Sequence, residues 1–174
     1  MAHPLVEQLR FTRSEFQRAL RPITVEEGSR HFGSMNSAGW IVGHLAAQEQ
    51  FYWHIMGQGN VIAPEVFVAA SGQPMSTPPM DEMWRHWEAI TEAANLLLDT
   101  FTNDTLLTRF TNPETGQPWR ENVGTMLLRQ TYHYWFHIGE SQAIRQMLGH
   151  TDLPTFVGAL YETPYRPADE TPVS

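Results

Sequence analysis

Four stretches of the chain carry apolar residues every three or four positions, which is the spacing of one helix face, and this pattern constrains the fold more than any other feature. The predicted helices span residues 5–20, 37–56, 81–101 and 122–148. Their ends carry residues that start or stop helices: Asn36 or Ser37 and Asp81 as N-caps, Gly57 and Gly149 as stops. Four amphipathic helices that must each bury one face predict an all-α fold, a helical bundle.

Segments rich in Pro, Gly, Ser and Asn separate these helices. The stretch Gly57–Met80 is a long connection without clear structure, and such connections are often functional or mobile. Residues 111–118 are polar and carry the turn signals Asn112-Pro113 and Thr115-Gly116, which allow a small hairpin. We expect one domain, with the bundle over residues 1–150 and an extended, proline-containing tail over residues 151–174 that packs on or near it.

The composition limits the chemistry that the chain can perform. The sequence has no Cys, and all 11 basic residues are Arg, so Lys is missing too. Without Cys there are no disulfides, thiolate nucleophiles, iron–sulfur clusters or Cys-ligated zinc. Without Lys there is no Schiff-base chemistry and no Walker A lysine. Catalysis is therefore left to His, carboxylates, hydroxyls and a bound ion.

Charge and hydropathy indicate which partners are excluded. The net charge of −8 argues against a nucleic-acid partner, which needs a basic patch to displace counterions. No stretch approaches about 18 uninterrupted apolar residues, so no membrane span is predicted. The N-terminus lacks a charged region followed by an apolar core, so no signal peptide is predicted either. We therefore expect a cytoplasmic protein whose partner is a small-molecule substrate.

Three histidines indicate a candidate metal site. His133 and His137 are one helical turn apart, so they project from the same face of the last predicted helix, although this spacing alone is weak evidence. His44 lies in the middle of the apolar stripe of the second helix. Three histidines that point into one core are hard to satisfy by protein hydrogen bonds alone. A divalent ion such as zinc, nickel or iron would satisfy all three and leave coordination positions open.

Two segments resemble a known family. The stretch Met35–Glu49, with the sequence MNSAGWIVGHLAAQE, resembles the first histidine segment of the DinB/YfiT-like family of candidate metalloenzymes. The stretch His133–Glu140, HYWFHIGE, followed by Ile144–Gly149, IRQMLG, resembles the second segment of that family. The single histidine comes first and the paired histidines come last, as they do in the family. The resemblance covers all four predicted helices.

The resemblance implies a four-helix bundle with a long crossover connection, commonly a homodimer, and a divalent-metal site formed by His44, His133 and His137. Some members of the wider superfamily are transferases or isomerases that depend on a low-molecular-weight thiol, so a thiol cosubstrate is one option. One departure is Glu140, where the family often has Gln. Glu140 shares the face of the two paired histidines, and three roles are open to it: fourth ligand, general base, or anchor for a ligand imidazole.

Other side chains are assigned by their position. Trp40, Gln48 and Phe51 lie within two turns of His44 and are expected to form the pocket wall or to contact the ligands. Arg13 interrupts the apolar face of the first helix, and we expect it to reach the surface along its alkyl stem. An inward guanidinium that meets an anionic substrate is the alternative. The histidines expected at the surface are His3, His31, His54 and His150.

These features together predict a divalent-metal-dependent enzyme that acts on a small molecule, either as a thiol-dependent transferase or as a hydrolase. The ion would act as a Lewis acid and lower the pKa of a bound water or thiol. The alternative is a non-catalytic metal- or ligand-binding bundle with a stress-related accessory role. A third interpretation is a metal-free interaction module whose histidines are hydrogen-bonded in the core.

Overall fold

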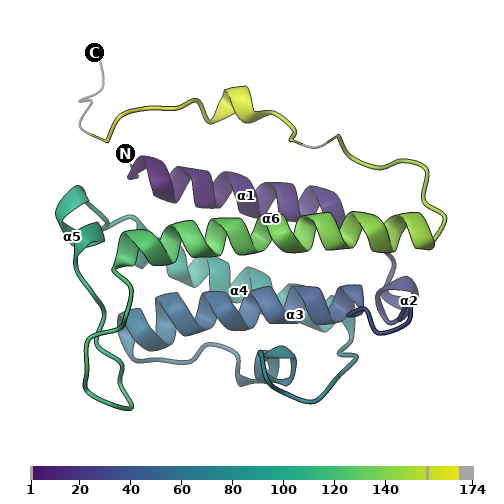
Figure 1. Ribbon diagram of the computed structural model, residues 1–174, viewed down its shortest axis with the longest axis horizontal. Coiled ribbons are helices and arrows are strands. Elements are labelled where there is room, and N and C mark those ends of the chain that lie inside the picture. The colour runs from purple at the N-terminus through teal and green to yellow at the C-terminus, as the bar shows by residue number, and fades with distance from the viewer. Residues whose placement is uncertain (1, 156, 169–174) are drawn as a thin grey trace.

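The computed structural model describes residues 2–155 and 157–168, and within these residues the fold is all-α, as predicted. Four long helical segments form the body (Figure 1). They are α1 (Pro4–Leu20), α3 (Ala38–Glu49) with its π-helical continuation η1 (Gln50–Met56), α4 (Met80–Leu98) and α6 (Val123–Met147). The shorter helices are α2 (Val25–Gly28), the 3-10 helix η2 (Pro64–Ala69), α5 (Asn103–Leu107) and the 3-10 helix η3 (Leu160–Glu162). No described helix is long and apolar enough to cross a membrane.

The long connection between η1 and α4 makes α3 and α4 parallel. It runs back along the bundle from one end to the other (Figure 1). The two helices therefore start side by side, with Gly39 packed against the backbone carbonyl of Pro78. Helices α1 and α6 are parallel as well, because Arg145 near the end of α6 donates to the carbonyl oxygen of Ala19 at 3.1 Å. This is the long crossover that the resemblance implies, and it contains η2.

Polar caps set the starts of α3 and α6 at the predicted positions. The side chains of Ser37 and Asn122 each accept a hydrogen bond from the backbone N–H three residues further on. The boundaries of α4 differ from the prediction, because the helix begins after Pro79 and ends before Phe101. Asp81 is therefore not the N-cap but lies in the first turn of α4. There its negative charge still interacts favourably with the positive end of the helix dipole.

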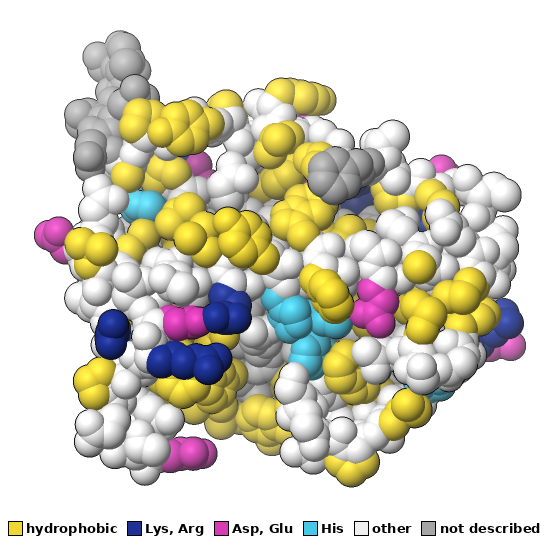
Figure 2. Space-filling view, viewed as in Figure 1, with side chains coloured by type: hydrophobic (Ala, Val, Ile, Leu, Met, Phe, Trp, Pro, Cys, Tyr) yellow, Lys and Arg dark blue, Asp and Glu magenta, His cyan; other side chains and the backbone are white. Residues whose placement is uncertain are grey.

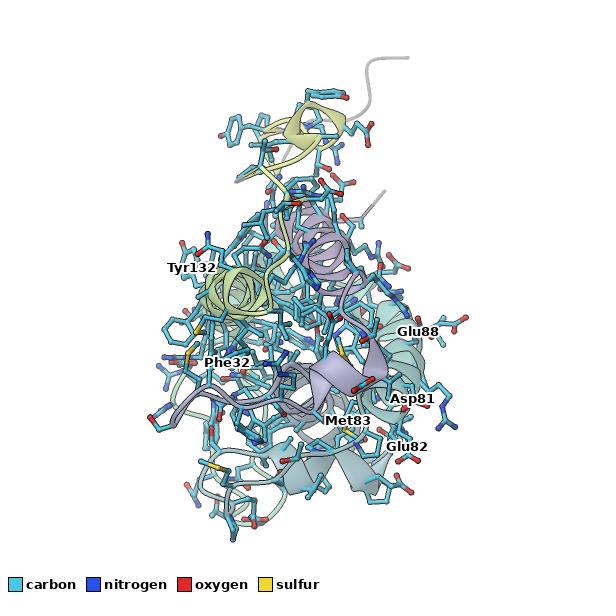
Figure 3. All side chains as sticks on the ribbon, turned by 90° about the vertical axis from the view of Figure 1, so that its right-hand side faces the viewer. Phe32, Asp81, Glu82, Met83, Glu88 and Tyr132 are labelled. Atoms are coloured by element: carbon cyan, nitrogen blue, oxygen red, sulfur yellow. The ribbon has the colours of Figure 1, made fainter. Side chains whose placement is uncertain are left out.

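Glycine in α3 allows the neighbouring elements to approach closely. A Cβ atom on Gly43 would lie 2.6 Å from Sδ of Met83 in α4 and 3.1 Å from Cβ of Ala69 at the end of η2. Met83 projects toward α3, whereas Asp81 of the same helix is exposed on the outer side (Figure 3). This packing fixes the crossover connection against α3 at the residue that precedes His44.

A buried ion pair joins α1 to α3. Arg13 donates from Nε and Nη2 to the two carboxylate oxygens of Glu49 at 2.8 and 2.6 Å, and the two side chains are 6% and 0% exposed. Tyr134 of α6 donates its hydroxyl to Glu49 and accepts from the indole N–H of Trp87 in α4. Burial would lower the pKa of Arg13, but the Glu49 carboxylate holds that pKa above its ordinary value. The expectation that Arg13 reaches the surface is therefore wrong, and the four long helices meet at this network.

Two further local predictions need correction or refinement. His54 is not at the surface: it lies in η1, is 1% exposed and donates from Nε2 to the carbonyl oxygen of Ile90 at 2.9 Å. The π-helical turn places it in the core. The polar loop at residues 111–118 forms the short antiparallel pairing that its turn signals allow, with a bridge between Thr111 and Pro118.

The described part of the C-terminal tail lies along α1 (Figure 1). The Glu15 carboxylate accepts a hydrogen bond from the backbone N–H of Gly158 at 2.9 Å. The side chain of Gln8 donates to the carbonyl oxygen of Thr163 at 3.1 Å. These bonds hold the tail on the outer face of the bundle as far as Thr163. The end of the predicted tail, 169–174, lies outside the described residues.

Candidate metal centre

Three histidine side chains from two helices meet at one point of the bundle. His44 comes from α3, and His133 and His137 come from α6 one turn apart. The Nε2 atom of His133 lies 3.3 Å from Nε2 of His44 and 2.9 Å from Nε2 of His137. The ligand atoms of all three lie within 4.8 Å of one another. Tetrahedral zinc with bonds of about 2.0–2.1 Å separates its ligand nitrogens by about 3.3 Å, so the cluster has the spacing of a metal site.

The crossover connection orients His44. Its Nδ1 atom lies 2.9 Å from the backbone carbonyl oxygen of Ala69 at the end of η2. Because a carbonyl oxygen only accepts, Nδ1 carries the proton and the lone pair of Nε2 faces the cluster. The indole of Trp40 stacks on the imidazole, with the ring centroids 4.4 Å apart and 11° between the planes. Trp40 therefore fixes the plane of the ligand ring.

Glu140 orients His137 in the same way. Its Oε2 atom lies 2.8 Å from Nδ1 of His137, and the two side chains are 18% and 5% exposed. A carboxylate only accepts, so Nδ1 of His137 donates to Glu140 and Nε2 faces the cluster. Of the three roles open to Glu140, this contact favours the anchor for a ligand imidazole.

The cluster cannot be satisfied by hydrogen bonds alone. His44 presents the lone pair of Nε2 to the cluster, whereas Nε2 of His133 carries at most one hydrogen. The Nδ1 atom of His133 is buried and has no hydrogen-bond partner among the described residues. Burial lowers the pKa of His44 to about 4 and that of His133 to about 3, so both rings are neutral at pH 7. Three converging imidazoles fit a divalent metal ion, which would accept one lone pair from each ring.

A pocket of about 1210 Å³ opens beside His44 and His133. Figure 2 shows histidine side chains at the edge of a hollow in the surface. Gln48 and Phe51 lie on the wall of this pocket. Gln48 also donates to the hydroxyl of Tyr52 at 3.3 Å. The histidine cluster is thus accessible from a cavity large enough for a small organic molecule.

Several groups at the site were not found from the sequence. The carbonyl oxygen that binds His44 belongs to the backbone of Ala69, and no side-chain pattern marks it. Phe67 from η2 and Tyr132 from α6 line the pocket, and their positions depend on the crossover and on the orientation of α6. Arg129 also lines the pocket, and its position one turn before His133 was a usable signal.

A helical bundle that holds three converging histidines beside a pocket belongs to the class of candidate metal-binding helical proteins. The family model of the DinB superfamily matches residues 8–141, a range that contains all three histidines. The chain belongs to the DinB superfamily. No curated protein matches the chain.

Proposed function

We propose that this protein is a divalent-metal-dependent enzyme that acts on a small molecule in the pocket beside His44 and His133. The observation that carries the proposal is the convergence of three imidazole nitrogens at the wall of a pocket of about 1210 Å³. Three protein ligands leave coordination positions for water or substrate, which is the pattern of catalytic metal sites. Zinc, nickel and iron are the metals that we expect for such a donor set.

The ion, when bound, would supply Lewis acidity that lowers the pKa of water or of a thiol. The residues of the chain would bind and orient the reactants around it. Phe51 offers an apolar surface for the substrate, and the amide of Gln48 offers a polar group one turn from His44. Glu140 would position His137 through Nδ1, on the side of the ring away from the cluster, and would not touch the substrate.

Two reaction classes suit this site, thiol transfer and hydrolysis. A chain without Cys cannot supply a thiolate of its own. A low-molecular-weight thiol cosubstrate would provide that nucleophile in a transferase, and water would provide it in a hydrolase. The pocket volume of about 1210 Å³ leaves room for a second reactant in either case.

We also propose that the protein works in the cytoplasm as a homodimer. One face of α6 carries three apolar side chains at helical spacing, Leu128, Tyr132 and Phe136, which are 38%, 66% and 69% exposed, and the first two also border the pocket. Apolar side chains gathered on one helix face are typical of an interface between protein chains. Sedimentation analysis of the full chain measures the mass, and a monomer at all concentrations contradicts the dimer.

The first experiment measures the metal content of protein purified without a histidine tag. We expect about one divalent ion for each chain in the wild type and loss of that ion in the His44→Ala variant. His86→Ala is the matched control, because His86 lies on α4 outside the cluster. A wild type without stoichiometric metal, or a His44→Ala variant that keeps all of it, contradicts the metal site.

The second experiment separates an enzyme from a binding protein. The metal-loaded protein is incubated with electrophiles and the thiols glutathione, mycothiol and bacillithiol, and in parallel with ester and amide substrates. Turnover that disappears in the His44→Ala variant supports a metal-dependent enzyme and identifies its reaction class. Metal binding without turnover of any of these substrates would favour the non-catalytic metal-binding bundle.

A further inference from the structure

The pocket beside the histidine cluster has one cationic side chain among the described residues that line it, and this is Arg129. The guanidinium is fixed by Glu121, which accepts bonds from Nε at 3.0 and 2.9 Å and another from Nη2. These contacts occupy one edge of the planar guanidinium. The Nη1 group forms no hydrogen bond among the described residues, so the second edge of Arg129 is available to a ligand.

Arg129 lies at a fixed distance from the histidine cluster along α6. Thr125, Arg129 and His133 succeed one another at intervals of four residues and all line the same pocket. Four residues advance an α-helix by about 6 Å along its axis. A molecule in this pocket can therefore contact the histidine cluster with one end and the Arg129 side chain with a group further along α6.

The other residues that line the pocket determine which chemical groups of a ligand fit between the histidine cluster and Arg129. Phe51, Phe67 and Tyr132 supply aromatic surfaces, and Leu128 supplies an aliphatic one. Glu114, on the loop before α6, is the one carboxylate among the described lining residues. Because Glu121 already pairs with one edge of this single guanidinium and Glu114 lies on the wall, the pocket suits at most one further anionic group, and a dianion such as a phosphate would require further cationic groups.

We propose that Arg129 binds the carboxylate of a substrate or cosubstrate whose reactive group lies at the histidine cluster. The ligand class is a small organic acid whose apolar body separates its carboxylate from the reacting atom. This inference rests on the proposed function, since it places the reactive group at the metal. Arg129 is then a specificity-determining residue that orients the ligand by a charge-assisted hydrogen bond.

The test uses the full-length protein loaded with cobalt and two probes that differ only in charge, 4-mercaptobutanoate and 4-mercaptobutanamide. The thiolate of each probe binds the metal and produces a thiolate-to-cobalt absorption band, from which a dissociation constant is measured. At low salt we expect the carboxylate to bind about five- to tenfold more tightly than the amide, because the partly exposed guanidinium is screened by solvent.

Variants assign the preference to Arg129. Arg129→Gln should bind both probes equally, and Arg129→Lys should restore part of the preference. Arg120→Gln is the matched control, because Arg120 stacks near Trp119 and does not line the pocket, so the preference should persist. Glu114→Gln should increase the preference, because it removes a like charge from the wall.

The outcomes separate this inference from the proposed function. If cobalt binds and both probes produce the band without a carboxylate preference, Arg129 has no role in binding and only this inference fails. It also fails, again without affecting the proposed function, if Arg129→Gln keeps the full preference of the wild type. If the protein binds no cobalt, the proposed function fails and this inference fails with it.

Discussion

The Glu140 carboxylate and the His137 imidazole are joined by a hydrogen bond of 2.8 Å from Nδ1 to Oε2. The two residues lie three positions apart on α6, so one helix supplies a ligand and its anchor. The bond fixes the ring orientation and leaves Nε2 facing His133 at 2.9 Å. A carboxylate at this position also raises the basicity of the imidazole more than a neutral amide would, so that Nε2 binds a metal ion more strongly.

Replacement of Glu140 should weaken metal binding without unfolding the protein. A glutamine can still accept a hydrogen bond from Nδ1 but lacks the charge, so Glu140→Gln should reduce the affinity for zinc by about tenfold. Glu140→Ala removes the acceptor and should reduce it further, by up to about 100-fold. Competition with a chromophoric chelator measures both affinities. Equal affinity in the wild type and Glu140→Ala would show that the contact does not support the ligand.

Removal of the metal should lower the thermal stability. An ion that binds only the folded state stabilises it by about 2.7 kcal/mol when its concentration is 100 times the dissociation constant. For a chain of this size, that corresponds to about 5–10 °C in Tm. We therefore expect a chelator to lower the Tm of the wild type by this amount and to leave the Tm of His133→Ala unchanged. If the chelator lowers the Tm of both proteins equally, its effect does not come from removal of an ion from the histidine cluster.

The helices and the histidine cluster could be predicted because their signals are local. Ser37 and Asn122 are caps that satisfy the first N–H groups of a helix within a few residues of sequence. His133 and His137 share a face through the helical period alone. The position of His44 opposite them follows once the apolar stripes of two helices are packed on one core.

Features that depend on distant segments could not be predicted in this way. Arg13 interrupts the apolar face of α1, but its partner Glu49 is 36 positions away, so the pattern alone did not distinguish an inward side chain from one that reaches the surface. The backbone carbonyl of Ala69 reaches His44 only because the crossover returns along α3. The π-helical turn that buries His54 likewise shows no periodicity that distinguishes it from an α-helix.

The buried pair of Arg13 and Glu49 should be strongly coupled. Glu49→Ala leaves a guanidinium in the core without its partner and should reduce the free energy of unfolding by about 3–5 kcal/mol. The double variant Arg13→Met, Glu49→Met removes both charges and should be considerably more stable than Glu49→Ala. Urea denaturation measures each value.

A surface ion pair provides the control for this experiment. Arg21 and Glu88 form an ion pair whose side chains are 46% and 49% exposed. Because solvent screens this pair, Glu88→Ala should cost less than about 1 kcal/mol. If Glu49→Ala and Glu88→Ala reduce the free energy of unfolding by similar amounts, the buried pair of Arg13 and Glu49 contributes no more stability than an exposed pair.

Glu27 should make the stability depend on acid pH. Hydrogen bonds from the Thr24 backbone N–H, from His150 and from the Thr24 hydroxyl lower the pKa of Glu27 from 4.5 to about 2. Because the folded state favours the ionised carboxylate, this contribution is fully present above pH 4.5 and is lost as the pH falls toward 2. The wild type should therefore exceed Glu27→Gln in stability at pH 6, and the difference should vanish near pH 2. Urea denaturation across this range measures it, with Glu26→Gln as the control for the loss of one charge from α2. A difference that stays constant from pH 6 to pH 2 would mean that the carboxylate of Glu27 is not stabilised by folding.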